Sequence, residues 1–192
     1  MMGSMKTNIT RGFFTKRKSP PQSPNIYLIG IMGSGKSTVG RLLAERLNFF
    51  FIDMDRELEM HTGLPLIGIH SSLGTRKIQQ LHMNFLKNGH PPSNCIVACS
   101  GGLAARSEHI ARIRNKGMVF FLTASPNTLL ARIRNHPKRP ILAQPDALER
   151  VRKLSNHSHS LGIRATKIID TENLSSREVA ESILTIYRQT EK

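Results

Sequence analysis

The sequence predicts one three-layer α/β domain built around a five-stranded parallel sheet. From residue 25 onward, short apolar runs alternate with amphipathic segments, a pattern typical of parallel strands joined by helices. The chain has 192 residues, which is enough for one sizeable core and too few for two ordinary domains. We therefore expect helices on both faces of a single sheet.

Five apolar runs are the predicted strands, at residues 26–29, 49–52, 96–99, 118–122 and 167–169. A first helix is predicted after the glycines that follow the first strand, and further helices at 55–61, 74–88, 106–115, 127–134, 146–160 and 176–189. Two helices carry start signals. Ser125 precedes Pro126 at a first helical position, and Ser175 with Glu178 has the spacing of a capping box.

The first 24 residues differ in composition from the rest of the chain. They hold five basic residues, no Asp or Glu, and a cluster of prolines. The segment also shows no lasting hydrophobic periodicity, so we predict a disordered leader over 1–24 and a folded domain over 25–192. The leader's composition is compatible with an organelle transit peptide and with the remnant of a tag.

The net charge of +15 would suit a nucleic-acid-binding protein. The basic residues beyond the leader are isolated, however, and lack the interleaved aromatic residues on which bases stack. We therefore expect a solvated basic face and an anion-binding pocket rather than a nucleic-acid partner. No run of eighteen apolar residues occurs, so no membrane span is expected.

The only cysteines, Cys95 and Cys99, lie in an apolar run without the spacing of a metal site. Buried, reduced thiols are the simpler interpretation. Reduced thiols predict a cytoplasmic protein, and targeting to an organelle through the leader is the alternative.

The stretch from Gly30 to Ser37 fits the phosphate-loop pattern G-x-x-x-x-G-K-[ST] and lies between a predicted strand and helix. Its glycines allow backbone N–H groups to surround an anion at a helix N-terminus. The lysine supplies charge to the β- and γ-phosphates, and the serine is placed to ligate Mg²⁺. We predict a nucleoside triphosphate site formed by Gly33, Ser34, Gly35, Lys36, Ser37 and Thr38.

Asp53 and Asp55 follow the second predicted strand, at the sheet edge where ligands bind in open α/β folds. Alternation along the strand would place both side chains on one side. Beside a magnesium–phosphate centre, one carboxylate can orient metal-bound water while the other orients or deprotonates an acceptor hydroxyl. Alternatively, Asp55 is only the N-cap of a helix that begins at Arg56.

These motifs, with IVACSGG at residues 96–102 and RPIL at 139–142, occur in the order and spacing of shikimate kinases. The chain resembles that family over about residues 25–190. The resemblance implies a P-loop kinase fold like that of nucleoside monophosphate kinases, with strand order 2-3-1-4-5 and a mobile lid over 135–145. It also implies transfer of the γ-phosphoryl group of ATP to shikimate with the help of Mg²⁺. We expect the protein to be a monomer.

The resemblance further implies residue roles. Asp55 would bind the hydroxyl that is phosphorylated, and Asp53 would lie in the outer shell of the metal. The substrate would approach the backbone at Gly101 and Gly102. Two arginines complete the implied site: Arg139 in the lid, which would neutralise charge during transfer and act with Lys36 and Asp55 as catalytic residues, and Arg132, which would lie against the adenine.

Two positions depart from the family pattern. Shikimate kinases hold the substrate carboxylate with two arginines, and Gln79 and His157 stand at those positions here; Ser100 also replaces a glycine. Losing two charge-assisted hydrogen bonds could cost on the order of 3 to 6 kcal/mol. Arg76, one helical turn before Gln79, and a protonated His157 are hypothetical substitutes, and ordinary surface roles are the alternatives.

Three hypotheses follow from these matches and departures. The chain is a shikimate kinase with a rearranged carboxylate clamp, a diverged kinase for another small alcohol, or a non-catalytic ATP-binding module. Because the residues for ATP, Mg²⁺ and hydroxyl activation are all present, we favour the first.

Overall fold

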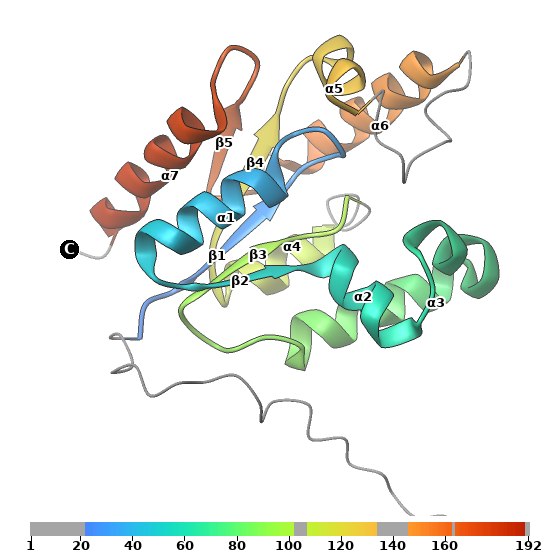
Figure 1. Cartoon of the computed structure of the whole chain (residues 1–192), viewed down its shortest axis with the longest axis horizontal. Coiled ribbons are helices and arrows are strands. Elements are labelled where there is room, and N and C mark those ends of the chain that lie inside the picture. Colours follow the sequence, from blue (N-terminus) through green and yellow to red (C-terminus); the bar gives the residue numbers. More distant parts are fainter. Residues whose placement is uncertain (1–21, 102–106, 134–145, 163, 191–192) are drawn as a thin grey trace, which may run out of the picture.

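A five-stranded parallel sheet forms the centre of the fold (Figure 1). The computed structural model describes residues 22–101, 107–133, 146–162 and 164–190. The sheet order is β2-β3-β1-β4-β5, as the family resemblance implies. The strands are β1 (Asn25–Ile29), β2 (Phe50–Asp53), β3 (Cys95–Ala98), β4 (Gly117–Thr123) and β5 (Lys167–Asp170).

Helices follow the strands within the described ranges, and their bounds lie within two residues of the predicted ones except at the start of the third helix. They are α1 (Lys36–Leu47), α2 (Met54–Thr62), α3 (Leu66–Asn88), α4 (Ser107–Arg114), α5 (Pro126–Ile133), α6 (Ala147–Gly162) and α7 (Ser176–Thr190). Both predicted start signals are confirmed. The Ser125 hydroxyl accepts from the Thr128 N–H at 3.2 Å, and Glu178 accepts from the Ser175 N–H at 2.7 Å.

Alternating side chains of β1 enter two separate cores. Ile26 and Leu28 pack with apolar residues of α1 and α7, whereas Tyr27 and Ile29 pack with residues of α3 and α4. Figure 1 shows α1 and α7 side by side on one face of the sheet and α3 and α4 on the other. A strand buried on both faces reads as a continuous apolar run, which explains why β1, β3 and β4 were recognisable from the sequence.

Helix α3 begins eight residues earlier than predicted. Gly74, with φ of 68°, interrupts the helix, and the predicted start at residue 74 therefore marks a kink rather than an end. The missed segment carries its own signal, since Leu66, Ile69 and Leu73 recur at helical spacing and pack in one cluster. The Leu66 N–H donates to the Glu59 carboxylate at 2.9 Å, which ties the start of α3 to α2.

The packed chain begins slightly before the predicted domain boundary. Ser23 exchanges hydrogen bonds with Asn94, and the Pro24 carbonyl accepts from the Tyr187 hydroxyl at 2.6 Å. These two residues therefore belong to the domain, although the sequence placed them in the leader. The rest of the predicted leader, up to residue 21, lies outside the described residues.

Both cysteines are buried and free of disulfide bonds, as predicted. Burial raises the pKa of each thiol to about 12, so both stay protonated at neutral pH. Neither thiol is therefore a reactive nucleophile. No described helix combines the length and apolar character needed to cross a membrane.

Tyr27 and His90 form a polar cluster at the end of the sheet opposite the phosphate loop. His90 Nδ1 lies 2.8 Å from the Pro91 carbonyl, which can only accept, so Nδ1 carries the proton of the neutral ring. His90 Nε2 then accepts from the Tyr27 hydroxyl at 3.3 Å. Burial is the main cause that lowers the His90 pKa from its ordinary value of 6.5, with a smaller contribution from the charge on Lys116. Burial and these hydrogen bonds therefore favour the neutral form of His90.

We expect this cluster to lower the free energy of unfolding in mild acid. Because the pKa of His90 is lower in the folded than in the unfolded state, its stabilisation is complete above pH 6.5 and is lost as the pH falls through the folded pKa. Urea unfolding of the wild type and of His90→Gln between pH 8 and 5 measures this. The difference between the two should shrink toward pH 5, and a constant difference would contradict the assignment.

Candidate functional site

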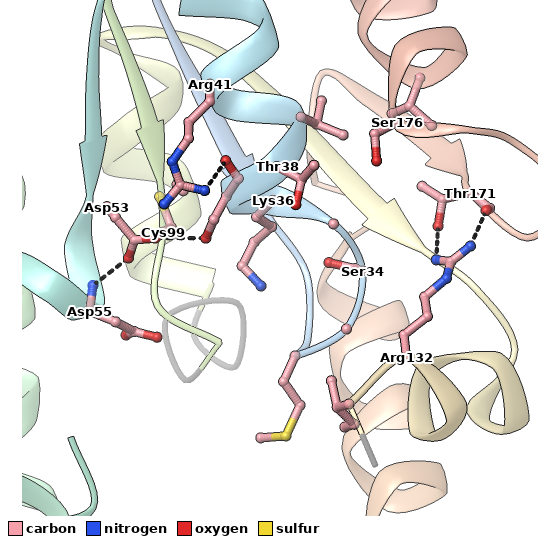
Figure 2. Close-up of a pocket in the computed structure, with 18 of the residues that line it drawn as sticks. Ser34, Lys36, Thr38, Arg41, Asp53, Asp55, Cys99, Arg132, Thr171 and Ser176 are labelled. Carbon is pink, nitrogen blue, oxygen red and sulfur yellow. Dashed lines mark hydrogen bonds between the residues drawn. The ribbon is translucent and has the colours of Figure 1, made fainter. Parts of the chain in front are cut away.

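A cavity of about 1130 Å³ lies at the carboxyl edge of the sheet (Figure 2). Its walls come from the β1–α1 loop, the start of α2, the end of α5, and the loop between β5 and α7. Parallel strands all end at this edge, so side chains far apart in the sequence meet here. The lining includes every predicted phosphate-loop residue from Gly33 to Thr38, together with Asp53, Asp55 and Arg132.

The phosphate loop turns tightly against α5. Gly33 has φ of 82°, and a Cβ at this position would lie 2.7 Å from the Leu129 carbonyl oxygen. A side chain would therefore be strained and would clash with α5. Gly35 precedes α1 in a left-handed conformation, which leaves the first N–H groups of α1 directed at the cavity. The Ser34 hydroxyl is buried in this loop, with no hydrogen-bond partner in the described part of the chain.

Lys36 places its ammonium group over the loop. Its Nζ donates to the Ile31 carbonyl at 3.0 Å, and Figure 2 shows the side chain extending into the cavity. Thr38 follows in the first turn of α1 and also lines the cavity. A positive charge beside the N-terminus of a helix makes this region suited to a polyphosphate.

Ser37 and Asp53 join the phosphate loop to the end of β2. The Ser37 hydroxyl donates to Asp53 Oδ2 at 2.6 Å, although the two residues come from α1 and the end of β2. Hydroxyl and carboxylate oxygens are the hard donors that Mg²⁺ prefers. In the described chain, no cluster of three or more His, Cys, Asp or Glu could hold a metal. A Mg²⁺ ion at Ser37 and Asp53 would therefore depend on phosphate oxygens and water as well.

The structure corrects the predicted local setting of Asp55. Helix α2 begins at Met54, and its N-cap is Asp53, whose Oδ1 accepts from the Asp55 N–H at 3.2 Å. The alternative that Asp55 is the N-cap of this helix is therefore wrong. Strand alternation is also not what brings the carboxylates together, because Asp55 already lies in the first helical turn. Both still line the cavity, and Figure 2 shows them facing the same space as Lys36.

Arg132 lies at the opposite end of the cavity from Asp55. Its guanidinium donates to the Thr171 hydroxyl at 2.9 Å and to the Thr171 carbonyl at 2.7 Å. Glu172, which follows Thr171, accepts hydrogen bonds from Ser125 and Thr128 at the start of α5. The Thr128 hydrogen bond contributes most to lowering the Glu172 pKa, so this carboxylate stays charged at neutral pH. The loop after β5 is thus held firmly against α5.

The remaining predicted residues differ in how the structure places them. Gly101 lies beside the phosphate loop, since a Cβ there would be 3.8 Å from the Met32 nitrogen. Gly102 and Arg139 lie outside the described residues. Gln79 is half-buried on α3 and His157 is exposed on α6, and neither lines the cavity. Their role as substrate contacts stays a prediction.

Arg76 is exposed on α3 and is likewise absent from the lining. The cavity does include charged residues that the sequence interpretation missed, namely Arg41, Arg56 and Glu59. Helical spacing holds a signal for two of them, because Arg41 lies four residues after Ser37 and Glu59 four residues after Asp55. The cavity is therefore more highly charged than the sequence interpretation predicted.

Comparison with known proteins identifies the family. The family model described as shikimate kinase matches residues 32–188. The shikimate kinase of Thermodesulfovibrio yellowstonii is 35% identical and covers 86% of this chain and 95% of its own length. That of Sulfurihydrogenibium sp. is 34% identical and covers 84% and 96%.

Solved structures agree with the sequence comparison. Shikimate kinase from Acinetobacter baumannii, in complex with shikimate, superposes with a TM-score of 0.81 at 29% identity and covers 88% of this chain and 94% of its own. The Aquifex aeolicus enzyme gives a TM-score of 0.74 at 29% identity, with coverage of 87% and 97%. The predicted fold is confirmed, and the chain belongs to the shikimate kinase family.

Proposed function

We propose that this chain transfers the γ-phosphoryl group of ATP to a hydroxyl group of shikimate. The observation that carries the proposal is the position of Asp55, which shares one cavity with Lys36, Ser37 and Asp53. A carboxylate facing a phosphate site can receive an alcohol, whereas a simple nucleotide-binding module has no need of one. Bound shikimate in the Acinetobacter baumannii relative supports this choice of acceptor.

On the donor side, the phosphate loop and α1 bind the triphosphate. The N–H groups of Gly35 to Thr38 and the Ser34 hydroxyl would contact the β- and γ-phosphates, and Lys36 would offset their charge. Mg²⁺, when bound, neutralises charge on the β- and γ-phosphate oxygens. Ser37 would ligate it directly, and Asp53 would hold it through water. Arg132 would support the adenine at the other end of the cavity.

On the acceptor side, Asp55 would orient the attacking hydroxyl and receive its proton. The new bond joins the acceptor oxygen to the γ-phosphorus, and the bond from that phosphorus to the β–γ bridging oxygen breaks, which releases ADP. Gly101 and Gly102 would allow the backbone to approach the substrate. Resemblance to shikimate kinases assigns charge neutralisation during transfer to Arg139, since a cation beside the transferred group would stabilise its developing charge.

Replacing Asp55 by Asn tests the acceptor role. Loss of the proton acceptor should lower kcat by about 10²- to 10⁴-fold, while the KM for ATP stays unchanged because the phosphate loop is intact. Shikimate-dependent ADP release in a coupled assay measures both. Glu57→Gln is the matched control, since Glu57 lies in the same helical turn and does not line the cavity.

Two outcomes of this assay would contradict the proposal. An Asp55→Asn protein with the wild-type shikimate-dependent rate would remove Asp55 from the reaction. A wild-type protein that releases no ADP with millimolar shikimate, yet still binds ATP, would favour the second hypothesis, a kinase for a less anionic alcohol. That hypothesis has a specific basis, because Gln79 and His157 stand where the family holds a carboxylate with arginines.

Restoring one arginine tests whether the carboxylate clamp is weakened. Gln79→Arg would add a charge-assisted hydrogen bond of about 1.5 to 3 kcal/mol, so the KM for shikimate should fall roughly ten- to a hundredfold. The KM for ATP should not change. Gln80→Arg adds the same charge at an exposed neighbouring position and is the control. If both variants change the KM for shikimate equally, or if neither changes it, Gln79 does not face the substrate.

A further inference from the structure

We propose that Gly40, Arg41 and Phe51 form a positioning unit that sets the distance between Ser37 and Asp53. The inference rests on the phosphoryl-transfer function proposed above, and only on its donor half. Ser37 and Asp53 are carried by different elements, α1 and β2, and a single hydrogen bond of 2.6 Å joins them. Something beyond that bond must fix the spacing of the two elements.

Gly40 lets α1 approach β2 closely. A Cβ at Gly40 would lie 2.5 Å from Phe51 Cε2 and 3.1 Å from Cδ2, so the ring rests directly against the helix backbone. Glycine is a poor helix former, and its presence inside α1 is explained by this contact. The Phe51 ring therefore acts as the spacer between helix and strand.

Arg41 holds the same ring from the helix side. Its guanidinium carbon lies 5.0 Å from the Phe51 ring centroid, within the range of a cation–π contact. Its Nη1 also donates to the Ser37 carbonyl at 3.2 Å, and Figure 2 shows Arg41 and Asp53 close together at the same side of the cavity. One side chain thus contacts both the spacer and the first turn of α1.

The Arg41–Phe51 contact and the Ser37–Asp53 hydrogen bond both connect α1 with β2. Arg41 lies four residues after Ser37 on α1, and Phe51 lies two residues before Asp53 on β2. Four helical residues rise about 6 Å and two strand residues about 6.6 Å. The distance from Ser37 to Arg41 along α1 therefore matches the distance from Asp53 to Phe51 along β2. Residues two apart on a strand share a face, which places Phe51 and Asp53 both toward α1.

This spacing matters because Mg²⁺ requires short oxygen distances and near-ideal octahedral geometry. A small change in the α1–β2 distance would move the Ser37 and Asp53 oxygens apart. Nucleotide binding through the phosphate loop would be little affected, because Gly33 to Lys36 precede the contact. The unit should therefore influence metal affinity and kcat more than the KM for ATP.

The test uses Arg41→Met, Arg41→Lys and Phe51→Leu in the full chain. Mn²⁺ binding to the complex with a non-hydrolysable ATP analogue is measured by electron paramagnetic resonance, without any acceptor. We expect Mn²⁺ affinity to fall about three- to tenfold in Arg41→Met and Phe51→Leu, with Arg41→Lys retaining most of it because a cation stays over the ring. In the complete reaction kcat should fall with metal affinity, while the KM for ATP stays within twofold.

Matched controls lie on the same two elements. Arg46→Met removes an arginine of α1 that pairs with Glu181, away from the cavity, and Phe50→Leu removes the exposed neighbouring ring of β2. Both should bind Mn²⁺ as the wild type does. Wild-type affinity in Arg41→Met and Phe51→Leu, or equal losses in the controls, would overturn the positioning role. If the wild-type protein itself binds no metal–nucleotide complex, the donor half of the proposed function fails with it.

Discussion

The hydrogen bond from the Ser37 hydroxyl to Asp53 is the interaction on which the site depends. It joins the phosphate loop, which follows β1, to the carboxylate at the end of β2. In the sheet, β3 lies between β1 and β2, so no backbone hydrogen bonds join these two strands directly. The side-chain bond connects the segments at their carboxyl ends. Asp53 accepts this bond with one oxygen and begins α2 with the other, which in turn fixes the backbone of Asp55. In the proposed reaction, the Asp53 carboxylate therefore connects the residues that would bind the phosphate donor with Asp55, which would bind the acceptor.

The arrangement of charge follows from that connection. Cations line the cavity beside the phosphate loop and at Arg132, and the carboxylates of Asp53, Asp55 and Glu59 lie with Arg56 at and near the start of α2. In the proposed reaction, a triphosphate with Mg²⁺ would lie between the two groups, where the metal would offset the repulsion between phosphate oxygens and the carboxylates. The apolar cores on both faces of the sheet stabilise the strand ends that carry these groups, and no catalytic role is needed from the buried cysteines.

Much of the fold could be predicted because its signals are local. The phosphate loop is a continuous stretch, and strands buried on both faces give unbroken apolar runs. The strand order came only from family resemblance, because spacing along the chain does not encode it. Asp55 was predicted to share the alternation of the second strand, but it lies in α2, because the strand ends at Asp53 and the helix begins at the next residue. The contact of Arg41 with Phe51 could not be foreseen, because it depends on how α1 packs on β2. Whether Gln79 and His157 contact a substrate is likewise a question of tertiary position.

The central claim is that phosphate passes to an alcohol placed by Asp55 rather than to water. Phosphorus NMR of a reaction containing ATP, Mg²⁺ and shikimate measures this directly, because a phosphate monoester and inorganic phosphate give separate signals. The account predicts a monoester signal that grows in equal amount with ADP, with no inorganic phosphate. Release of inorganic phosphate alone, at a rate independent of shikimate, would contradict it.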